Sequence, residues 1–258
     1  MLNRILILFG NELNKNNLLV TGQYLKEKYE TEVYGLYVRD IRKYEVLPPT
    51  VEGLAVDTSA NLMIRDWEKT ENIQVEELKK VFKNYFPVEH LLVEDGVPQE
   101  ILQEKMFGFD LIIAEKSNKI TDNQKDLLRH HYKPVLLIPE NNSLKVEKVI
   151  IANSKSERVN KSVFAFLNMF DRSNNFTSVA VNLEDETDDE FSKYMEIAGK
   201  TLNILELEGK AIDIISEKSK EFDILIMGDL KHSFLLEKLT RDTGLKLLEN
   251  IEIPIYIG

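Results

Sequence analysis

The chain has no cysteine among its 258 residues. This absence excludes a disulfide-stapled domain, a cysteine zinc site, a thiolate nucleophile and an iron–sulfur cluster. Positive charge is also scarce, because 33 Lys and Arg residues stand against 44 Asp and Glu residues, for a net charge of -11. Affinity for nucleic acid is built mainly on Lys and Arg, so this balance argues against a nucleic-acid partner.

Long apolar runs are missing as well. The apolar segment 5–9 is shorter than a signal-peptide core, and no stretch approaches the roughly 20 apolar residues of a membrane span. We therefore expect a cytoplasmic protein with no membrane partner. The length fits two domains of about 100–150 residues each. A content of 43% hydrophobic and 30% charged residues is typical of a globular chain.

Motifs for catalysis and metal binding are equally scarce. The histidines His90, His130, His131 and His232 form no His-x-x-x-His or His-Glu-x-x-His spacing, and His130 and His131 are neighbours on a predicted helix. No Gly-x-Ser-x-Gly elbow is present. The acidic run 184–190 lacks the order of a calcium loop and favours an acidic helix start. We expect no metal and no enzymatic activity.

The sequence does contain an internal repeat. Residues 94–114 and 207–227 share a glycine, a Glu-Lys pair and a Phe-Asp pair followed by an apolar run, at an offset of 113 residues. The segments 4–7 and 148–151 match at an offset of 144, and the closing apolar segments match at an offset of 120. Three matches in the same order indicate a tandem duplication. We predict domains at 1–140 and 146–258, joined by a short polar linker.

Each half alternates apolar strands with amphipathic helices, which is typical of a parallel sheet covered on both faces. In the first half we predict strands at 4–9, 32–38, 88–93, 109–114 and 134–138, and helices at 14–29, 60–86, 98–106 and 121–131. In the second half we predict strands at 147–152, 176–181, 202–206, 222–227 and 253–257, and helices at 156–171, 188–199, 210–220 and 234–249.

The segment 40–86 has no equally long counterpart in the second half. We favour a longer helix packed on its sheet, with Leu62, Ile64 and Trp67 partly buried. A segment that covers a pocket or a partner surface is the alternative.

Each half resembles the universal stress protein domain, and the whole chain resembles a tandem protein of that family. The resemblance rests on a first strand that follows a basic residue, Arg4 or Lys148. It rests also on the helix starts at 96–98 and 209–211, each followed by Phe-Asp, and on closing strands that begin with proline. It implies two Rossmann-like (adenine nucleotide alpha hydrolase-like) domains, each a five-stranded parallel sheet with helices on both sides. The strand order in the family is 3-2-1-4-5.

The closing strands suggest how the two halves meet. In the resembled family these strands pair antiparallel across a domain or subunit interface. Here they carry Val135, Leu136, Leu137, Ile255 and Tyr256, and they are apolar on both faces. Pairing is also what an exposed apolar edge requires. We predict an internal pseudo-dimer of the two halves; a further homodimer of two chains and the identity of a protein partner are left open.

Glycines decide how the resemblance bears on nucleotides. ATP-binding family members carry an Asp at the end of the first strand. After the fourth strand they carry Gly-x-x-Gly, nine residues and Gly-Ser/Thr, since glycine lets the backbone approach phosphate. The second half keeps Gly228 but has Lys231 and Arg241-Asp242 at the other positions, and Asn153-Ser154 replaces the Asp. The loop of the first half keeps no glycine. We therefore expect no ATP cofactor.

A remnant anion site in the second half would comprise Asn153, Ser154, Gly228, Lys231, His232, Ser233, Arg241 and Asp242. We favour a solvated loop there, and Gly228 fits either interpretation. The predicted function is a non-enzymatic stress-response protein that binds a partner or a small ligand. One alternative is a nucleotide-binding member that uses the second-half site. Another is an ATP-pyrophosphatase-type enzyme, against which the missing Ser-Gly-Gly-x-Asp-Ser loop argues.

Overall fold

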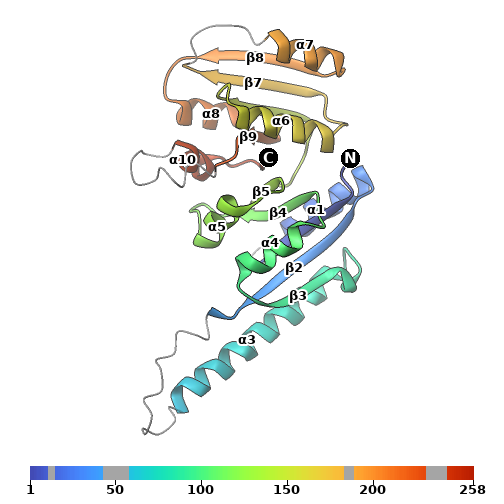
Figure 1. Ribbon diagram of the computed structural model, residues 1–258, viewed down its shortest axis with the longest axis vertical. Coiled ribbons are helices and arrows are strands. Elements are labelled where there is room, and N and C mark those ends of the chain that lie inside the picture. Colours follow the sequence, from blue (N-terminus) through green and yellow to red (C-terminus); the bar gives the residue numbers. More distant parts are fainter. Residues whose placement is uncertain (11–14, 43–57, 183–188, 231–242) are drawn as a thin grey trace.

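The computed structural model describes residues 1–10, 15–42, 58–182, 189–230 and 243–258 (Figure 1). The first half contains β1 (Arg4–Phe9), α1 (Lys15–Tyr29), β2 (Glu32–Asp40), α3 (Thr58–Phe82), β3 (Leu91–Gly96), α4 (Pro98–Met106), β4 (Leu111–Lys116), α5 (Asp122–His130) and β5 (Val135–Pro139). The second half contains β6 (Lys148–Asn153), α6 (Glu157–Met169), β7 (Asn175–Val181), α7 (Asp189–Ile197), β8 (Thr201–Leu207), α8 (Ala211–Ser219), β9 (Ile224–Met227), α10 (Thr243–Asn250) and β10 (Ile255–Ile257).

The strands of the described residues form one sheet of ten, in the order β3-β2-β1-β4-β5-β10-β9-β6-β7-β8. Within each half every neighbouring pair is parallel, and the order is 3-2-1-4-5 in both. The predicted fold class, two Rossmann-like halves with a five-stranded parallel sheet each, is therefore confirmed.

The two halves join where β5 pairs antiparallel with β10, a contact that we call the seam. Its register sets Val135, Leu136 and Leu137 opposite Ile257, Tyr256 and Ile255. All six side chains are buried. The Tyr256 ring packs edge-on against Phe166 of α6, with ring centroids 5.1 Å apart. The structure thus pairs the two strands that the sequence predicts to meet.

Helices cover both faces of the sheet, as the apolar strands require. One core lies under α1, α3, α6 and α7 and contains Leu18, Phe82, Phe166 and Met195. The other lies under α4, α5, α8 and α10 and contains Leu102, Leu127, Ile215 and Leu247. In Figure 1, α3 runs along β3 at one end of the sheet and extends beyond the strands.

The repeated Phe-Asp pair has a structural explanation. Asp110 accepts hydrogen bonds at its Oδ2 from the backbone N–H groups of Asn3 and Arg4, at 2.8 and 3.0 Å. Asp223 accepts the equivalent bond from Lys148 N–H at 2.8 Å. Each carboxylate therefore holds the start of the central strand of its half and satisfies backbone donors that no neighbouring strand reaches.

The region before β3 differs from the prediction. Residues 88–93 were expected to be a strand, but Val88–His90 form a 3-10 turn and the strand spans Leu91–Gly96. The helix predicted over 60–86 ends at Phe82. Pro87 accounts for the later start of the strand, because its carbonyl accepts from His90 N–H at 3.0 Å and closes the turn, and it disfavours helical backbone at Phe86.

Three other predictions need comment. His131 lies past the end of α5 as its C-cap, so His130 and His131 are not neighbours within a helix. Trp67 is half-buried, as expected, whereas the side chains of Leu62 and Ile64 lie outside the description. Of the helix predicted at 234–249, α10 begins only at Thr243, and residues 231–242 are outside the described residues, as are 183–188 of the acidic run.

We predict that Asp110→Ala and Asp223→Ala each lower the free energy of unfolding by about 1–3 kcal/mol, because backbone donors lose a charged acceptor. Urea unfolding at neutral pH measures the change. Glu221→Gln is the control, because this exposed side chain makes no hydrogen bond within the described residues. Stabilities of both aspartate variants equal to that of the control would contradict this role of the Phe-Asp pair.

Candidate functional site

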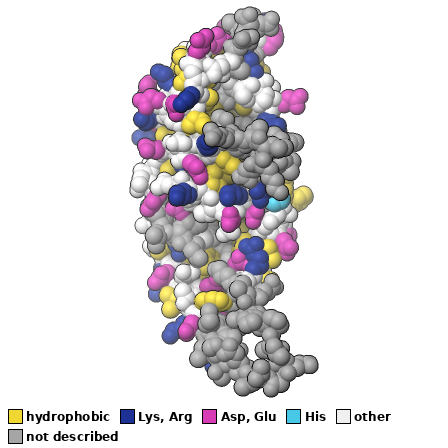
Figure 2. All heavy atoms as spheres, turned by 90° about the vertical axis from the view of Figure 1, so that its left-hand side faces the viewer, with side chains coloured by type: hydrophobic (Ala, Val, Ile, Leu, Met, Phe, Trp, Pro, Cys, Tyr) yellow, Lys and Arg dark blue, Asp and Glu magenta, His cyan; other side chains and the backbone are white. Residues whose placement is uncertain are grey.

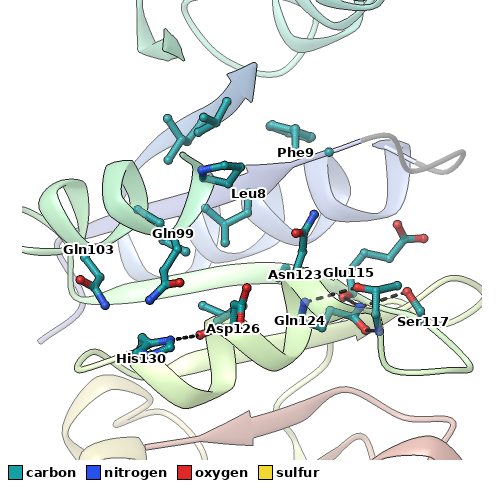
Figure 3. A pocket seen from close by; sticks show the side chains of 18 of the residues that line it. Leu8, Phe9, Gln99, Gln103, Glu115, Ser117, Asn123, Gln124, Asp126 and His130 are labelled. Atoms are coloured by element: carbon teal, nitrogen blue, oxygen red, sulfur yellow. Dashed lines mark hydrogen bonds between the residues drawn. The ribbon is translucent and has the colours of Figure 1, made fainter. Parts of the chain in front are cut away.

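A cavity of about 520 Å³ opens in the first half at the carboxyl ends of β1, β2 and β4, between α4 and α5. We call it the first-half cavity (Figure 3). It lies beside β1, whose neighbours β2 and β4 continue the chain toward opposite ends of the half. In open parallel sheets such a switch point is the usual position of a ligand crevice.

The inner wall of the first-half cavity is apolar. Leu8 and Ala114 come from the central strands, Leu102 and Met106 from α4, and Leu127 from α5. Met106 and Ala114 are 1% and 6% exposed, so their contact with the cavity is at the edge of the second core. Ala114 leaves room that a longer side chain would fill.

Side-chain amides stand above this apolar wall. Gln99 and Gln103 project from α4, four residues apart and therefore on one helix face, and Asn123 projects from α5. Within the part of the chain that the structure describes, these three amide groups make no hydrogen bond. Each offers an acceptor oxygen and two donor hydrogens to a bound molecule.

The fourth amide near the first-half cavity is fully engaged. Gln124 and Thr121 form a capping box at the start of α5, in which Gln124 N–H donates to Thr121 Oγ1 and Thr121 N–H donates to Gln124 Oε1. Gln124 Nε2 also donates to the Glu115 carbonyl at 2.6 Å and to Ser117 Oγ at 3.0 Å. This helix start is therefore occupied by its own side chains rather than open to an anion.

His130 ends α5 at the rim of the cavity. Its Nδ1 lies 2.9 Å from the Asp126 carbonyl oxygen, and because a carbonyl can only accept, Nδ1 carries the proton (Figure 3). In the neutral ring Nε2 is then an acceptor. The Asp126 carboxylate lies 3.9 Å from Arg129, its ion-pair partner on the outer side of the helix.

The charges that line the first-half cavity are mainly negative. Glu115, Asp126 and Glu140 contribute three carboxylates, and among the described lining residues Arg42 alone carries a fixed positive charge. Its guanidinium donates to both oxygens of Asp40, at 2.8 and 2.7 Å. This bidentate pair offsets the positive charge of Arg42.

Of the residues predicted for the second-half site, Asn153 and Ser154 make hydrogen bonds within the fold. Asn153 Nδ2 donates to Ser178 Oγ at 3.0 Å, and its Oδ1 accepts from Lys155 N–H at 2.8 Å. Ser154 Oγ lies 2.9 Å from Ser156 Oγ, which caps α6. Asn153 thus links the end of β6 to β7 and to the turn that follows it, and Ser154 contacts the cap of α6. The remaining predicted residues, Lys231, His232, Ser233, Arg241 and Asp242, lie outside the described residues.

Gly228 has a packing reason to be glycine. A Cβ atom built there would lie 3.1 Å from both Arg158 Cβ and the backbone nitrogen of Val159 at the start of α6. The loop after β9 therefore approaches α6 too closely for any other side chain to fit without movement. This contact accounts for the glycine without a nucleotide.

Two charged groups cross the seam at equivalent positions of the repeat. Lys116 ends β4 and is 6% exposed; burial lowers its pKa, while Glu249 and Glu252 of the second half raise it. In the second half Asp229 stands at the matching position, with Oδ1 3.8 Å from Nε2 of buried His131. Each half therefore sends one charge toward the last helix of the other.

The residues of the first-half cavity were missed by sequence reasoning, which searched for phosphate-binding glycines. A usable signal was the spacing of Gln99 with Gln103 and of Asn123 with Asp126 and His130, which places polar side chains on single helix faces. Among the described residues, no group of three or more His, Asp and Glu side chains could hold a metal ion. None of the described helices is long and apolar enough to span a bilayer.

Comparisons with known proteins agree on the fold. No protein-family profile and no curated protein matches the sequence. A solved universal stress protein from Archaeoglobus fulgidus DSM 4304 is 11% identical and superposes with a TM-score of 0.64, over 99% of this chain and 95% of that chain. A functionally unknown protein from Pseudomonas aeruginosa PAO1 is 16% identical, with a TM-score of 0.57 over 99% and 92%. The chain thus has the fold of a universal stress protein, as the resemblance implies.

We predict that Gly228→Ala lowers the free energy of unfolding by about 1–3 kcal/mol, the usual cost of forcing an extra methyl against fixed atoms. Thermal and urea unfolding without added ligand measure it. Gly108→Ala is the matched control, because its new Cβ would make only ordinary contacts, 3.4 Å from the Arg4 side chain and 3.8 Å from the Lys105 carbonyl oxygen. Equal stability of the two variants would show that packing on α6 does not explain Gly228.

We predict that Lys116→Met leaves the protein at least as stable at pH 7, because methionine fills the same space without a buried charge. The native lysine, with its lowered pKa, loses its proton before the unfolded one does. Wild-type stability should therefore gain on the variant between that lowered pKa and the ordinary lysine value of 10.5. Urea unfolding at pH 7 and 10 tests this, with exposed Lys119→Met as control. A loss of stability at pH 7 would mean that attraction to Glu249 and Glu252 outweighs burial.

Proposed function

We propose that the chain is a member of the universal stress protein family that acts in stress response without catalysis, by binding a small ligand or a partner. The first-half cavity is the binding site for the ligand in this proposal. Its position at the switch point of a parallel sheet, with an apolar wall and three uncommitted amides, is the observation that carries it.

The lining chemistry supports binding rather than reaction. Ser117, the serine among the described lining residues, accepts a hydrogen bond from Gln124 Nε2 at 3.0 Å, so an amide rather than a base stands beside its hydroxyl. His130 uses Nδ1 on a main-chain carbonyl instead of a carboxylate that would orient a catalytic imidazole. Such groups hold and orient a ligand without activating a nucleophile.

The surface of the described residues suits a protein partner better than a nucleic acid. Figure 2 views the face on which β2, β7 and β8 end, and Lys and Arg side chains alternate there with Asp and Glu side chains. Affinity for a phosphate backbone needs positive charges gathered together. The net charge of -11 points the same way.

Nucleotide binding in the second half is the rival function. The residues that would carry it, Lys231 and Arg241, lie outside the described residues, while Asn153 and Gly228 are accounted for by local bonds and packing. ATP-pyrophosphatase activity is a further rival. Nucleotide binding in the second half predicts a thermal shift with ATP that depends on Lys231 and Arg241, and pyrophosphatase activity predicts release of pyrophosphate from ATP.

We predict that Ala114→Leu, which fills the first-half cavity, removes the thermal shift produced by ligands found in a small-molecule screen. The matched control is Ala152→Leu in β6. Ala152 is the counterpart of Leu8 in the repeat and belongs to the same core as Ala114, but it does not line the first-half cavity. A bound ligand raises stability by mass action, so the wild type and the control should both respond. Ligands that shift Ala114→Leu equally would contradict the proposed site.

With millimolar ATP we expect no thermal shift and no release of phosphate or pyrophosphate. A shift lost in Lys231→Ala/Arg241→Ala but retained in Ala114→Leu would support the second-half nucleotide site instead. Release of pyrophosphate by the wild type would contradict the non-enzymatic proposal.

A further inference from the structure

We propose that two copies of this chain associate through β8, which pairs antiparallel with β8 of the second copy and extends the sheet across both. This association is independent of the proposed function, because β8 ends the strand order on the side opposite to the first half (Figure 1). Three features support it: an open strand edge, backbone groups that point outward, and a self-complementary row of side chains.

The open edge distinguishes β8 from β3, the strand at the other end of the sheet. Of the six residues of β3, Asp95 alone is exposed. In β8 four of seven residues are exposed, namely Thr201, Asn203, Ile204 and Glu206. The strand contains no proline, and its register with β7 runs through all seven residues without a bulge. Such an edge is a template for another strand.

The pairing with β7 fixes which backbone groups of β8 point outward. Thr201 N–H donates to the Asn174 carbonyl at 2.8 Å, and the Leu207 carbonyl accepts from the residue that follows β7. In a parallel ladder, alternate residues of an edge strand direct both backbone groups to the neighbouring strand. The odd-numbered residues of β8 therefore face β7, and the even-numbered ones face away from it. The outward groups belong to Leu202, Ile204 and Glu206.

The even-numbered positions also form a self-complementary row of side chains. From residue 200 onward the row reads Lys200, Leu202, Ile204 and Glu206. If residue 203 lies opposite its own copy in an antiparallel pair, each lysine of the row faces a glutamate and each leucine faces an isoleucine. Opposite charges and apolar side chains directly across two strands are the pairs that stabilise a sheet.

The neighbouring registers are less favourable. The outward backbone groups allow the next register in either direction, but one sets Leu202 opposite Glu206 and the other sets Lys200 opposite Ile204. Each places a charge against an apolar side chain, which costs free energy on burial. The row therefore selects one register, with residue 203 on the two-fold axis.

The two charged members of the row are available to each other. Glu206 is exposed and makes no hydrogen bond or ion pair within the described residues. Lys200 Nζ donates to the Asp171 carbonyl and, at 3.2 Å, to Asn174 Oδ1. An ammonium group has three hydrogens, so one remains for the glutamate of the second copy.

Sedimentation velocity of the full chain, from micromolar to millimolar concentration, tests the association. One strand pair is a small interface, so we expect a reversible dimer that forms as concentration rises. Glu206→Lys replaces attraction with repulsion at both ends of the row and should weaken the dimer about tenfold. The double variant Lys200→Glu/Glu206→Lys exchanges the signs and should restore it. Glu208→Lys is the matched control, because it makes the same charge change at an exposed residue just past β8.

The lack of native cysteine allows a second test. Asn203→Cys places two thiols opposite each other, at a position where antiparallel strands bring Cα atoms within disulfide range. Oxidation with diamide should convert this variant to a covalent dimer. Glu208→Cys is the control and should stay unlinked, because its two copies lie at opposite ends of the paired strands.

Each outcome supports or overturns the proposal. A chain that stays monomeric at millimolar concentration would overturn it and leave β8 to a strand of another protein. A dimer that Glu206→Lys does not weaken, and that Asn203→Cys does not link, would overturn β8 as the interface. Thermal unfolding checks that each variant keeps its fold. If Lys200→Glu proves unstable through loss of its bond to Asn174, linking of Asn203→Cys against Glu208→Cys decides the register.

Discussion

The antiparallel pairing of β5 with β10 is the interaction on which the rest of the structure depends. Only three residue pairs make the seam, yet all six side chains are buried and join two five-stranded sheets into one. Without the seam, each half would present an apolar strand with unpaired backbone groups to water. The Tyr256 ring, against Phe166 and Phe170 of α6, ties this edge to the core of the second half. Each half thus completes the other.

The two halves also differ in the charges that they direct across the seam. Lys116 and Asp229 occupy matching positions after the fourth strand, and both point their charge across the seam, toward Glu249 and Glu252 in one case and His131 in the other. Away from the seam the copies diverge. Ala114 and its counterpart Met227 are both buried core residues, but the smaller Ala114 borders the first-half cavity, and Gly228 brings the loop after β9 close to α6. We therefore propose binding for the first half, where the smaller residue stands at this position.

The fold could be predicted from the sequence because it depends on periodic and repeated sequence features. Apolar strands, matched Phe-Asp pairs and two closing strands predict the sheet, its order and its seam, since each depends on local pattern and on the burial of edges. The first-half cavity could not be predicted in the same way. Its lining comes from several elements, and its space exists because Ala114 is small beside Leu102 and Leu127. The glycines after the fourth strand of each half bear only on phosphate binding, and their number does not indicate whether amide side chains line a site. Likewise the predicted strand at 88–93 starts later, at Leu91, because a 3-10 turn capped by Pro87 occupies Val88–His90.

The most direct test of the account is amide hydrogen exchange, followed by mass spectrometry of peptides that cover β5, β10, β1 and β6. If the seam makes the ten strands one cooperative sheet, the β5 and β10 peptides should exchange only with global unfolding, as slowly as the central strands β1 and β6. Fast exchange at β5 and β10 while β1 and β6 stay protected would contradict the account. It would mean that the halves open at the seam and fold as separate units.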